Sequence, residues 1–339
     1  MSVRPFDWRD LLVLYRYRNR YVYLDMTRFL TQGRTFAPVG SIFSYLTPAF
    51  IQTTGVYTYQ SKDNGSSPQV IFGQATHVAG SPSARLAFLA PETAIESPGL
   101  FPLLEQLTVE VGSHGAYHLI AEVNEEEPAF EALRKAGFAI YTRQQIWRLS
   151  GEPHKNGIVS TWKSGSAQDI ISVRSLYCNL VPGLVQQVEP PPQNRLKGVV
   201  LRVNDEVKGY IELKSGPHGI WAQPFIHPDL DNVSGRLAYL LRNRFYGQDR
   251  FIYLCVRSYQ SWLETALVDL GAEVSSWQAV MVKRLSLVQK ARAFVVQAVE
   301  RGHPEISAPV THSESNSEVM TLTTPGTGDG DLGRVKKSI

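Results

Sequence analysis

The sequence predicts an α+β fold made of two similar domains in tandem, each with a mixed, mainly antiparallel sheet flanked by helices. The first observation behind this prediction is a strand–helix–glycine–strand unit that occurs twice, at residues 119–149 and 251–285. Its helix-ending glycines, Gly137 and Gly271, lie 134 residues apart, far more than the roughly 20 to 50 residues of a solenoid repeat. The second observation is the length of 339 residues, which suggests about two domains. A single large α/β domain with one sheet is the alternative.

The first copy of the unit has well-marked boundaries. An apolar run at residues 119–123 predicts a strand, and three glutamates at 125–127 precede a helix. Pro128 suits the first helical position, where its missing N–H would have no partner, and the glutamates complement the positive helix end. Gly137 is expected to end the helix, because glycine enters the left-handed region at no steric cost. A β-rich segment at 138–149 completes the unit.

The other elements are expected in the same order in each half. For the first half we expect strands at 3–6, 55–60, 70–78 and 84–90, and helices from Trp8 and over 100–111. For the second half we expect strands at 158–162, 198–203, 207–214 and 220–227, a helix at 167–180 and an extended segment at 182–194. Short strands separated by turn residues are typical of antiparallel meanders, and the turn at 204–206 predicts a hairpin.

These elements define five regions of the chain. The domains are expected at residues 1–150 and 158–286, joined by a polar linker at 151–157. A short helix is expected at 287–301. The tail at 302–339 is rich in Ser, Thr, Gly and Pro. We expect it to be disordered, because it cannot bury enough apolar surface to offset the entropy cost of ordering.

Charge and cysteine content exclude several classes of partner. The net charge is only +3, which argues against nucleic acid or an anionic membrane as a partner. A run of Tyr and Arg at residues 15–23 is interpreted as the polar side of a first helix rather than a nucleic-acid platform. Cys178 and Cys255 each lie among apolar residues, so we expect two free core thiols, no metal site and a cytoplasmic protein.

The repeated unit also carries a family resemblance. Residues 126–138 resemble the N-E-P-A-x-x-L-Y-x-K-x-G-F segment of GNAT acetyltransferases, and residues 260–272 resemble it more weakly through Leu267 and Gly271. The resemblance implies two GNAT-like domains in tandem. It also implies an acyltransferase that moves an acyl group from acetyl-CoA or another acyl-CoA to an amine, carried by a small molecule or a peptide. The oligomeric state does not follow from the sequence.

A second resemblance implies which residues hold the acyl-CoA. Residues 226–241 resemble the family sequence V-h-P-x-x-R-G-x-G-I-G-R-x-L-L, in which a strand end is followed by a phosphate-binding helix start. The main chain of Phe225, Ile226 and His227 would then pair with the pantetheine arm. Ser234, Gly235 and Arg236 would meet the diphosphate. His227 is the candidate general base, because it is the side chain at this strand end that titrates near neutral pH.

The sequence departs from the family at several of these positions. Val233 and Leu230 stand where the loop has its middle Gly and its Arg. In the first half only Gly99 of the corresponding loop remains, so that half is expected to have lost acyl-CoA binding. Leu133 and Leu267 replace the tyrosine that acts as proton donor in catalytic relatives. Two functions therefore stay open: an acyl-CoA-dependent acyltransferase whose second half is the active one, and a non-catalytic GNAT-fold binding or scaffold protein.

Overall fold

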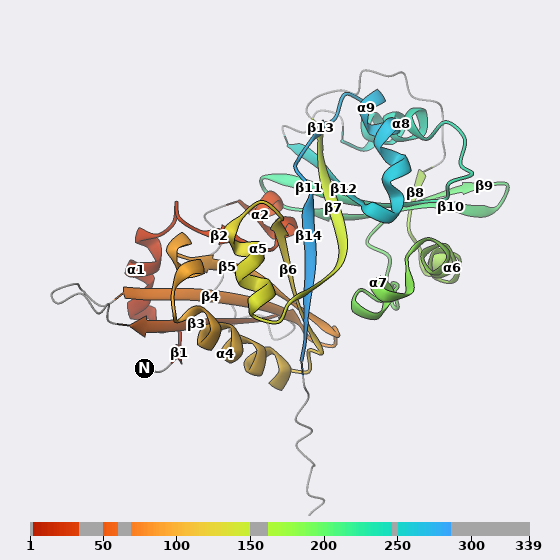
Figure 1. The fold of residues 1–339 in the computed structure, drawn as a ribbon. Helices are drawn as coiled ribbons and strands as arrows, with labels where there is room; N and C mark the ends of the chain where they lie inside the picture. The colour runs from red at the N-terminus through yellow and green to blue at the C-terminus, as the bar shows by residue number, and fades with distance from the viewer. Residues whose placement is uncertain (1–2, 34–49, 60–68, 150–161, 246–249, 286–339) are drawn as a thin grey trace, which may run out of the picture. The chain divides into compact units, whose positions relative to one another are not determined.

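The computed structural model describes residues 3–33, 50–59, 69–149, 162–245 and 250–285 (Figure 1). These residues belong to one unit, Met1–Gln289. The predicted linker at 151–157, the helix at 287–301 and the tail lie outside the described residues, so the domain boundaries stay predictions.

Each half contributes strands and helices in the predicted order. The first half contains β1 (Val3–Pro5), β2 (Val22–Tyr23), β3 (Phe50–Tyr59), β4 (Gln69–Val78), β5 (Ser83–Ala90), β6 (His118–Asn124) and β7 (Ala139–Leu149), with helices α1 (Leu11–Arg16), α2 (Met26–Gln32), α4 (Leu100–Ser113) and α5 (Pro128–Lys135) and 3-10 turns η1 (Trp8–Asp10) and η3 (Glu92–Glu96). The second half contains β8 (Trp162–Ser164), β9 (Gly198–Val203), β10 (Glu206–Ser215), β11 (Gly219–Ile226), β12 (Phe251–Arg257), β13 (Glu273–Val274) and β14 (Gln278–Arg284), with helices α6 (Ile170–Leu180), α7 (Gly183–Val188), α8 (Val233–Phe245) and α9 (Glu264–Asp269) and 3-10 turns η4 (Ala167–Asp169) and η5 (Ser258–Leu263).

All the described strands belong to one sheet. Its order is β1-β3-β4-β5-β6-β14-β7-β12-β11-β10-β9-β8, with β2 beside β5 and β13 beside β7. Neighbouring strands are antiparallel except for two parallel pairs, β5 with β6 and β11 with β12. The predicted fold class is confirmed, since each half is a mixed, mainly antiparallel sheet with flanking helices. The sequence did not predict that the two halves would be hydrogen-bonded into one continuous sheet.

The halves are joined because they exchange strands. β14 comes from the second half but lies between β6 and β7 of the first (Figure 1). The C-terminal part of β7 lies between β12 and β13 of the second half. The cores follow the same exchange: Ala279 and Met281 of β14 are buried in the first-half core, and Trp147 and Leu149 of β7 are buried in the second-half core.

The exchange has a local two-fold centre at two glutamines. Gln144 of β7 is paired in register with Gln278 of β14, and its side-chain Nε2 donates to Gln278 Oε1 at 3.0 Å. These residues are separated by the same 134 positions as Gly137 and Gly271. An antiparallel pair in which a residue meets its own counterpart lies on a two-fold axis, so the axis relating the halves passes through this pair.

The two glycines end their helices as predicted. Gly137 has φ +87° and Gly271 has φ +75°. The N–H groups of Phe138 and Ala272 donate to the carbonyls of Leu133 and Leu267 at 3.0 and 3.1 Å, which closes the last helical turn in each half. The predicted hairpin turn is also confirmed, since Asn204 and Asp205 both adopt positive φ.

Three local predictions are wrong. The segment expected to be extended at 182–194 begins with helix α7. The run at 15–23 is not one helix, because α1 ends at Arg16. The ring of Tyr21 instead stacks on that of Phe88, on β5, with 4.8 Å between ring centroids. This contact removes apolar ring surface from water. Cys178 is exposed on α6 rather than in the core, whereas Cys255 is buried.

The strand exchange predicts that the first half cannot fold without β14. We expect residues 1–157 alone to show no cooperative thermal transition, because β6 and β7 lose their shared partner and the core loses Ala279 and Met281. The same fragment with residues 273–285 appended through a flexible linker should regain a cooperative transition by circular dichroism. A sharp transition from the unmodified fragment would contradict the exchange.

Candidate functional site

The predicted acyl-CoA edge of the second half lies where two parallel strands separate. β11 and β12 are paired from Gly219 with Phe251 to Ala222 with Leu254, and they diverge beyond. The side chain of Gln260, in η5, fills this gap. Its Nε2 donates to the Pro224 carbonyl at 2.9 Å, and the Ile226 N–H donates to its Oε1 at 3.3 Å.

This arrangement shows what the β11 edge can bind. Gln260 is 1 % exposed, so both of its hydrogen bonds are shielded from water. Its primary amide offers one donor and one acceptor to the strand, as the secondary amide of an extended ligand would. Pro224 has no N–H to donate. A proline is tolerated at this position of β11 because the main-chain groups of residue 224 face the gap rather than β10.

The corresponding gap in the first half is filled by main chain. β5 and β6 are paired from Ser83 with His118 to Arg85 with Ile120 and then diverge. Leu24 bridges them: its N–H donates to the Ala87 carbonyl at 3.0 Å, and its carbonyl accepts the Glu122 N–H at 2.9 Å. The first half is thus closed by a segment of its own chain, and it does not fit an inserted acyl-CoA arm.

The predicted diphosphate residues lie at the start of α8, and they are capped from within the chain. The Gly235 N–H donates to Asn232 Oδ1 at 3.0 Å, and the Arg236 N–H donates to the Asn232 carbonyl at 3.1 Å. Arg236 Nε donates to the Asp231 carbonyl at 2.9 Å, and Ser234 is buried. An incoming phosphate must therefore compete with Asn232 for the helix start.

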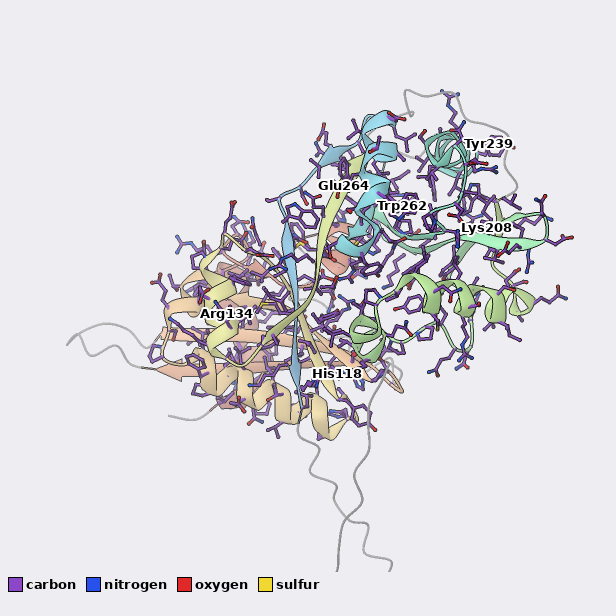
Figure 2. The ribbon with its side chains drawn as sticks, turned by 45° about the vertical axis from the view of Figure 1, so that its right-hand side comes forward. His118, Arg134, Lys208, Tyr239, Trp262 and Glu264 are labelled. Carbon is purple, nitrogen blue, oxygen red and sulfur yellow. The ribbon has the colours of Figure 1, made fainter. Side chains whose placement is uncertain are left out.

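His227 is poorly placed for the predicted role of base. The main-chain N–H of His227 donates to the main-chain carbonyl of Lys208 on β10 at 2.8 Å (Lys208 is labelled in Figure 2). Its Nδ1 accepts the Asp229 N–H at 3.2 Å. In a neutral imidazole the other nitrogen, Nε2, then carries the proton. Nδ1 is thus engaged within the turn, where it also lies 3.6 Å from a carboxylate oxygen of Asp229.

The other predicted positions are packing positions. The side chain of Phe225 lies in the cluster beneath α6, and Ile226 lies on the opposite face with α8 and α9. At the gap that Gln260 fills, only the main chain of these two residues is available to a ligand. Leu133 and Leu267 are buried in the two cores, and neither can supply a proton.

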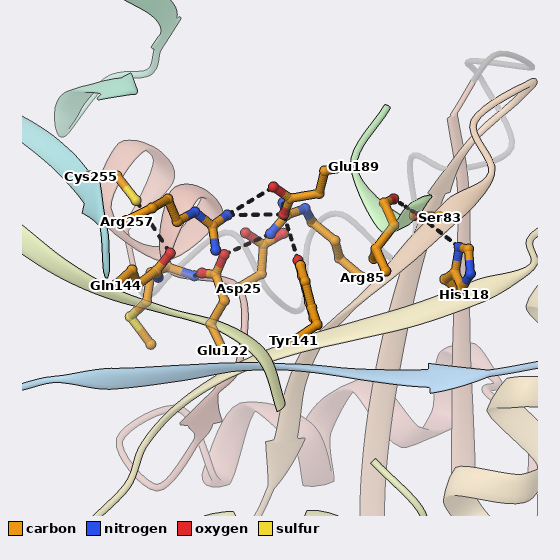
Figure 3. Close-up of polar contacts among 12 residues, drawn as sticks. Asp25, Ser83, Arg85, His118, Glu122, Tyr141, Gln144, Glu189, Cys255 and Arg257 are labelled. Carbon is orange, nitrogen blue, oxygen red and sulfur yellow. Dashed lines mark hydrogen bonds and ion pairs between the residues drawn. The ribbon is translucent and has the colours of Figure 1, made fainter. Parts of the chain in front are cut away.

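A network of buried charges links the two halves beside these gaps (Figure 3). Glu189 follows α7 in the second half, and its carboxylate accepts Arg257 Nη2 at 2.9 and 3.1 Å. It also accepts the hydroxyl of Tyr141, on β7, at 2.6 Å, and it lies 3.6 Å from Arg85 Nη2. Arg85 Nη1 donates in turn to Glu122 Oε1 at 2.8 Å.

The network sets the ionisation of its members. Burial raises the pKa of Glu189, but Arg257, Arg85 and the Tyr141 hydroxyl together outweigh burial and hold that pKa below its ordinary value. Burial, and next the Glu189 charge, raise the pKa of Tyr141 well above its ordinary value. Burial raises the pKa of Cys255 to about 12. The carboxylate therefore stays charged, while the phenol and the thiol stay neutral and unreactive.

Two further findings concern the described residues. Among them, no group of three or more His, Cys, Asp or Glu side chains is arranged to hold a metal ion. Their helices are all too short or too polar to cross a membrane.

The residues that fill the gaps were not found from the sequence. Gln260 stands where the GNAT segment has its Asn, in the second copy of that segment, and this substitution is the one feature of the sequence that singled out Gln260. Leu24 belongs to a short apolar run before Asp25, which caps α2 by accepting the Arg28 N–H at 3.2 Å. That pattern indicates a strand followed by a helix, but nothing in it indicates insertion between β5 and β6.

The Glu189 network generates a stability prediction. Glu189→Gln should lower the free energy of unfolding at pH 7 by about 3 kcal/mol, because it leaves Arg257 buried without a full counter-charge. Because the pKa of Glu189 is lower in the folded protein than the ordinary value of 4.5, its ionised carboxylate stabilises the fold fully at pH values above 4.5. This stabilisation is lost as the pH falls through the folded-state pKa. The difference between wild type and variant in urea titrations should therefore shrink below about pH 4.5.

Glu131→Gln is the matched control, because Glu131 pairs with Arg134 on the exposed face of α5. It should change stability by no more than about 0.5 kcal/mol. A difference for Glu189→Gln that stays constant from pH 7 to pH 3 would contradict this account.

The comparisons with known proteins find similar chains among solved structures alone. No family model matches the sequence, and no curated protein matches it. Among solved structures, a GCN5-related N-acetyltransferase from Sphaerobacter thermophilus shares 10% identity over 83% of this chain and 95% of its own, with a TM-score of 0.48. A tandem GNAT protein from the clavulanic acid biosynthesis pathway shares 14% identity over 84% and 98%, with a TM-score of 0.45. An acetyltransferase of the GNAT family from Colwellia psychrerythraea shares 10% identity over 84% and 100%, with a TM-score of 0.40.

These likenesses concern architecture and carry no information about substrates. The two halves described above share one strand pattern, in which a parallel pair diverges and an exchanged strand follows. These three solved structures are described as GNAT or GCN5-related N-acetyltransferases, the superfamily whose segments the sequence resembles.

Proposed function

We propose that the chain is an acyl-CoA-dependent N-acyltransferase in which the second half alone takes the acyl-CoA, after Gln260 has left the gap between β11 and β12. The GNAT fold supports a general acyltransferase function. The observation that supports the second half is the Gln260 amide itself, since it makes the two hydrogen bonds that an amide of an extended arm would make with Pro224 and Ile226.

The two gaps differ in what it takes to open them. Gln260 can leave by rotating its side chain, at the cost of its two hydrogen bonds. Opening the first-half gap requires moving the main chain at Leu24, which would also break β2 and the start of α2. Rotating one side chain leaves its own element folded, whereas moving the main chain at Leu24 requires local unfolding. The second half is therefore the binding half.

Displacing Gln260 makes binding weak. Each of its hydrogen bonds contributes about 1 kcal/mol net, so the two together lower the affinity by a factor on the order of tens. Competition from Asn232 at the start of α8 acts in the same direction. We expect dissociation constants on the order of hundreds of micromolar, or roughly −5 kcal/mol.

The chain's own residues bind rather than catalyse in this proposal. A bound acyl-CoA supplies an acyl group already activated as a thioester. The Pro224 carbonyl and the Ile226 N–H hold the arm. Because the His227 Nδ1 is engaged within its own turn and Leu267 has no proton to give, the acceptor amine enters as its free base. Loss of an acid or base of this kind costs about 10²- to 10⁴-fold in rate. The acceptor is an amine on a small molecule or a peptide.

The second candidate function is a non-catalytic GNAT-fold binding protein. It is favoured by the same contacts within the chain: Leu24 and Gln260 fill the two gaps, and Asn232 caps the start of α8. Acyl-CoA binding without acyl transfer to any amine would assign this function instead.

The proposal predicts that removing the Gln260 side chain improves binding. Gln260→Ala should raise the affinity for acetyl-CoA about tenfold in calorimetry, because the ligand no longer displaces two hydrogen bonds. Gln186→Ala is the matched control: its amide also donates to main-chain carbonyls, those of Cys178 and Val181, but it lies on α7, away from the gap. This control should bind as wild type does.

Two outcomes would contradict the proposal. One is no binding by either wild type or Gln260→Ala at millimolar acetyl-CoA. The other is equal binding by Gln260→Ala and Gln186→Ala, which would place the ligand elsewhere on the chain.

A further inference from the structure

We propose that a cavity at the junction of the two halves binds a small organic anion, with a carboxylate or phosphate group attached to a flat apolar body. The cavity has a volume of about 360 Å³. It lies between the start of β5 in the first half, the faces of β10 and β11 in the second, and the segment that follows α7. We call it the junction cavity. It is distinct from the Gln260 gap and requires no acyl-CoA.

Hydrogen bonds hold the wall of the junction cavity in place. The Ser83 hydroxyl on β5 donates to the Val188 carbonyl, at the end of α7, at 2.6 Å. The next residue, Glu189, is fixed by Tyr141 and Arg257. The chain at the end of α7 is thus tied to the first half at two successive residues, and Figure 3 shows the second of these contacts, between Glu189 and Tyr141. A wall fixed in this way pre-forms the cavity and reduces the ordering cost of binding.

The charges that line the cavity do not cancel. Four cations line it, Arg85, Arg195, Lys197 and Lys214, against the two carboxylates Glu189 and Glu212. Glu189 is bound by Arg257 and Arg85, and Glu212 lies 3.6 Å from Lys214. Among the described residues, no carboxylate is within ion-pair distance of Arg195 or Lys197. The lining therefore presents two uncompensated positive charges to a ligand.

Three aromatic side chains form part of the remaining wall, together with serine, proline, glutamine and aliphatic side chains. Tyr210 and Phe225 are stacked with ring centroids 6.1 Å apart, and Tyr177 lies 5.0 Å from Phe225. All three rings are buried, and all three line the cavity. A wall of this kind favours a flat apolar group, and the cations opposite favour an anion. The volume lies within the range of small-molecule sites, about 300 to 1,000 Å³.

The test uses the full chain and four probes of similar shape. Benzoate and phenyl phosphate carry the anion, and benzyl alcohol and benzylamine are the neutral and cationic comparators. In calorimetry at low salt we expect an anionic probe to bind and neither comparator to bind. Lys197→Ala and Arg195→Ala should each weaken that binding about tenfold, since each removes a charged donor from the lining and charge-assisted hydrogen bonds are the stronger ones. Stronger binding of benzoate assigns the carboxylate class, and stronger binding of phenyl phosphate assigns the phosphate class.

The control variant is Lys135→Ala, which removes an exposed lysine on α5, outside the cavity. It should bind the anionic probe as wild type does. Because Arg195, Lys197 and Lys135 are all exposed, their variants should melt at the wild-type temperature, so a loss of binding reports on the cavity. The proposal is overturned if no anion binds at millimolar concentration, if benzyl alcohol binds equally well, or if Lys197→Ala and Arg195→Ala bind no more weakly than Lys135→Ala.

Discussion

The exchange of β7 and β14 between the halves is the constraint on which the rest of the structure depends. β14 takes its ladder hydrogen bonds from β6 and β7 of the first half, and β7 takes its own from β12, β13 and β14 of the second half, so neither sheet is complete without the other. This arrangement removes two sheet edges that would otherwise be open to pairing with other chains. It also fixes β6 relative to β12, the strands that border the gaps filled by Leu24 and Gln260. Arg85, Tyr141, Glu189 and Arg257, which come from both halves, meet only because the exchange holds the halves in register.

The two gaps show how one topological feature can be closed in two ways with different consequences. In each half a parallel strand pair separates, which leaves main-chain N–H and C=O groups that must find partners when buried. Leu24 supplies main chain in the first half, and Gln260 supplies a side-chain amide in the second. Each satisfies two main-chain groups in the free protein, one on each strand for Leu24 and both on β11 for Gln260. They differ in reversibility, because a side chain can leave without unfolding its own element. The asymmetry between the halves therefore lies in how each gap is filled.

Local signals in the sequence were sufficient to predict most helices, strands and turns, and insufficient to predict the contacts of the candidate site. Gly137 and Gly271 could be predicted to end helices because the left-handed conformation is a property of one residue. The hairpin at Asn204 and Asp205 follows from the same kind of rule. The strand exchange, the insertion of Leu24 and the reach of Gln260 depend on which elements meet in three dimensions, and no local rule encodes that. The family resemblance implied a mixed, mainly antiparallel sheet with flanking helices in each half, as the structure has it, and its position for the second-half edge stays a prediction. It did not reveal that this edge is already hydrogen-bonded to Gln260.

The charge balance inside the protein explains why the junction cavity is positive. Arg85 and Arg257 are largely withdrawn from water, and buried guanidinium groups require carboxylate partners. Glu122 and Glu189 meet that requirement, and both of their carboxylates are held at the network. Glu189 forms part of the cavity wall, yet its charge is directed inward, so it does little to neutralise Arg195 and Lys197 at the rim. The preference for an anion thus follows from the contact that joins the halves: the carboxylate that stabilises the junction is no longer available to the cavity beside it.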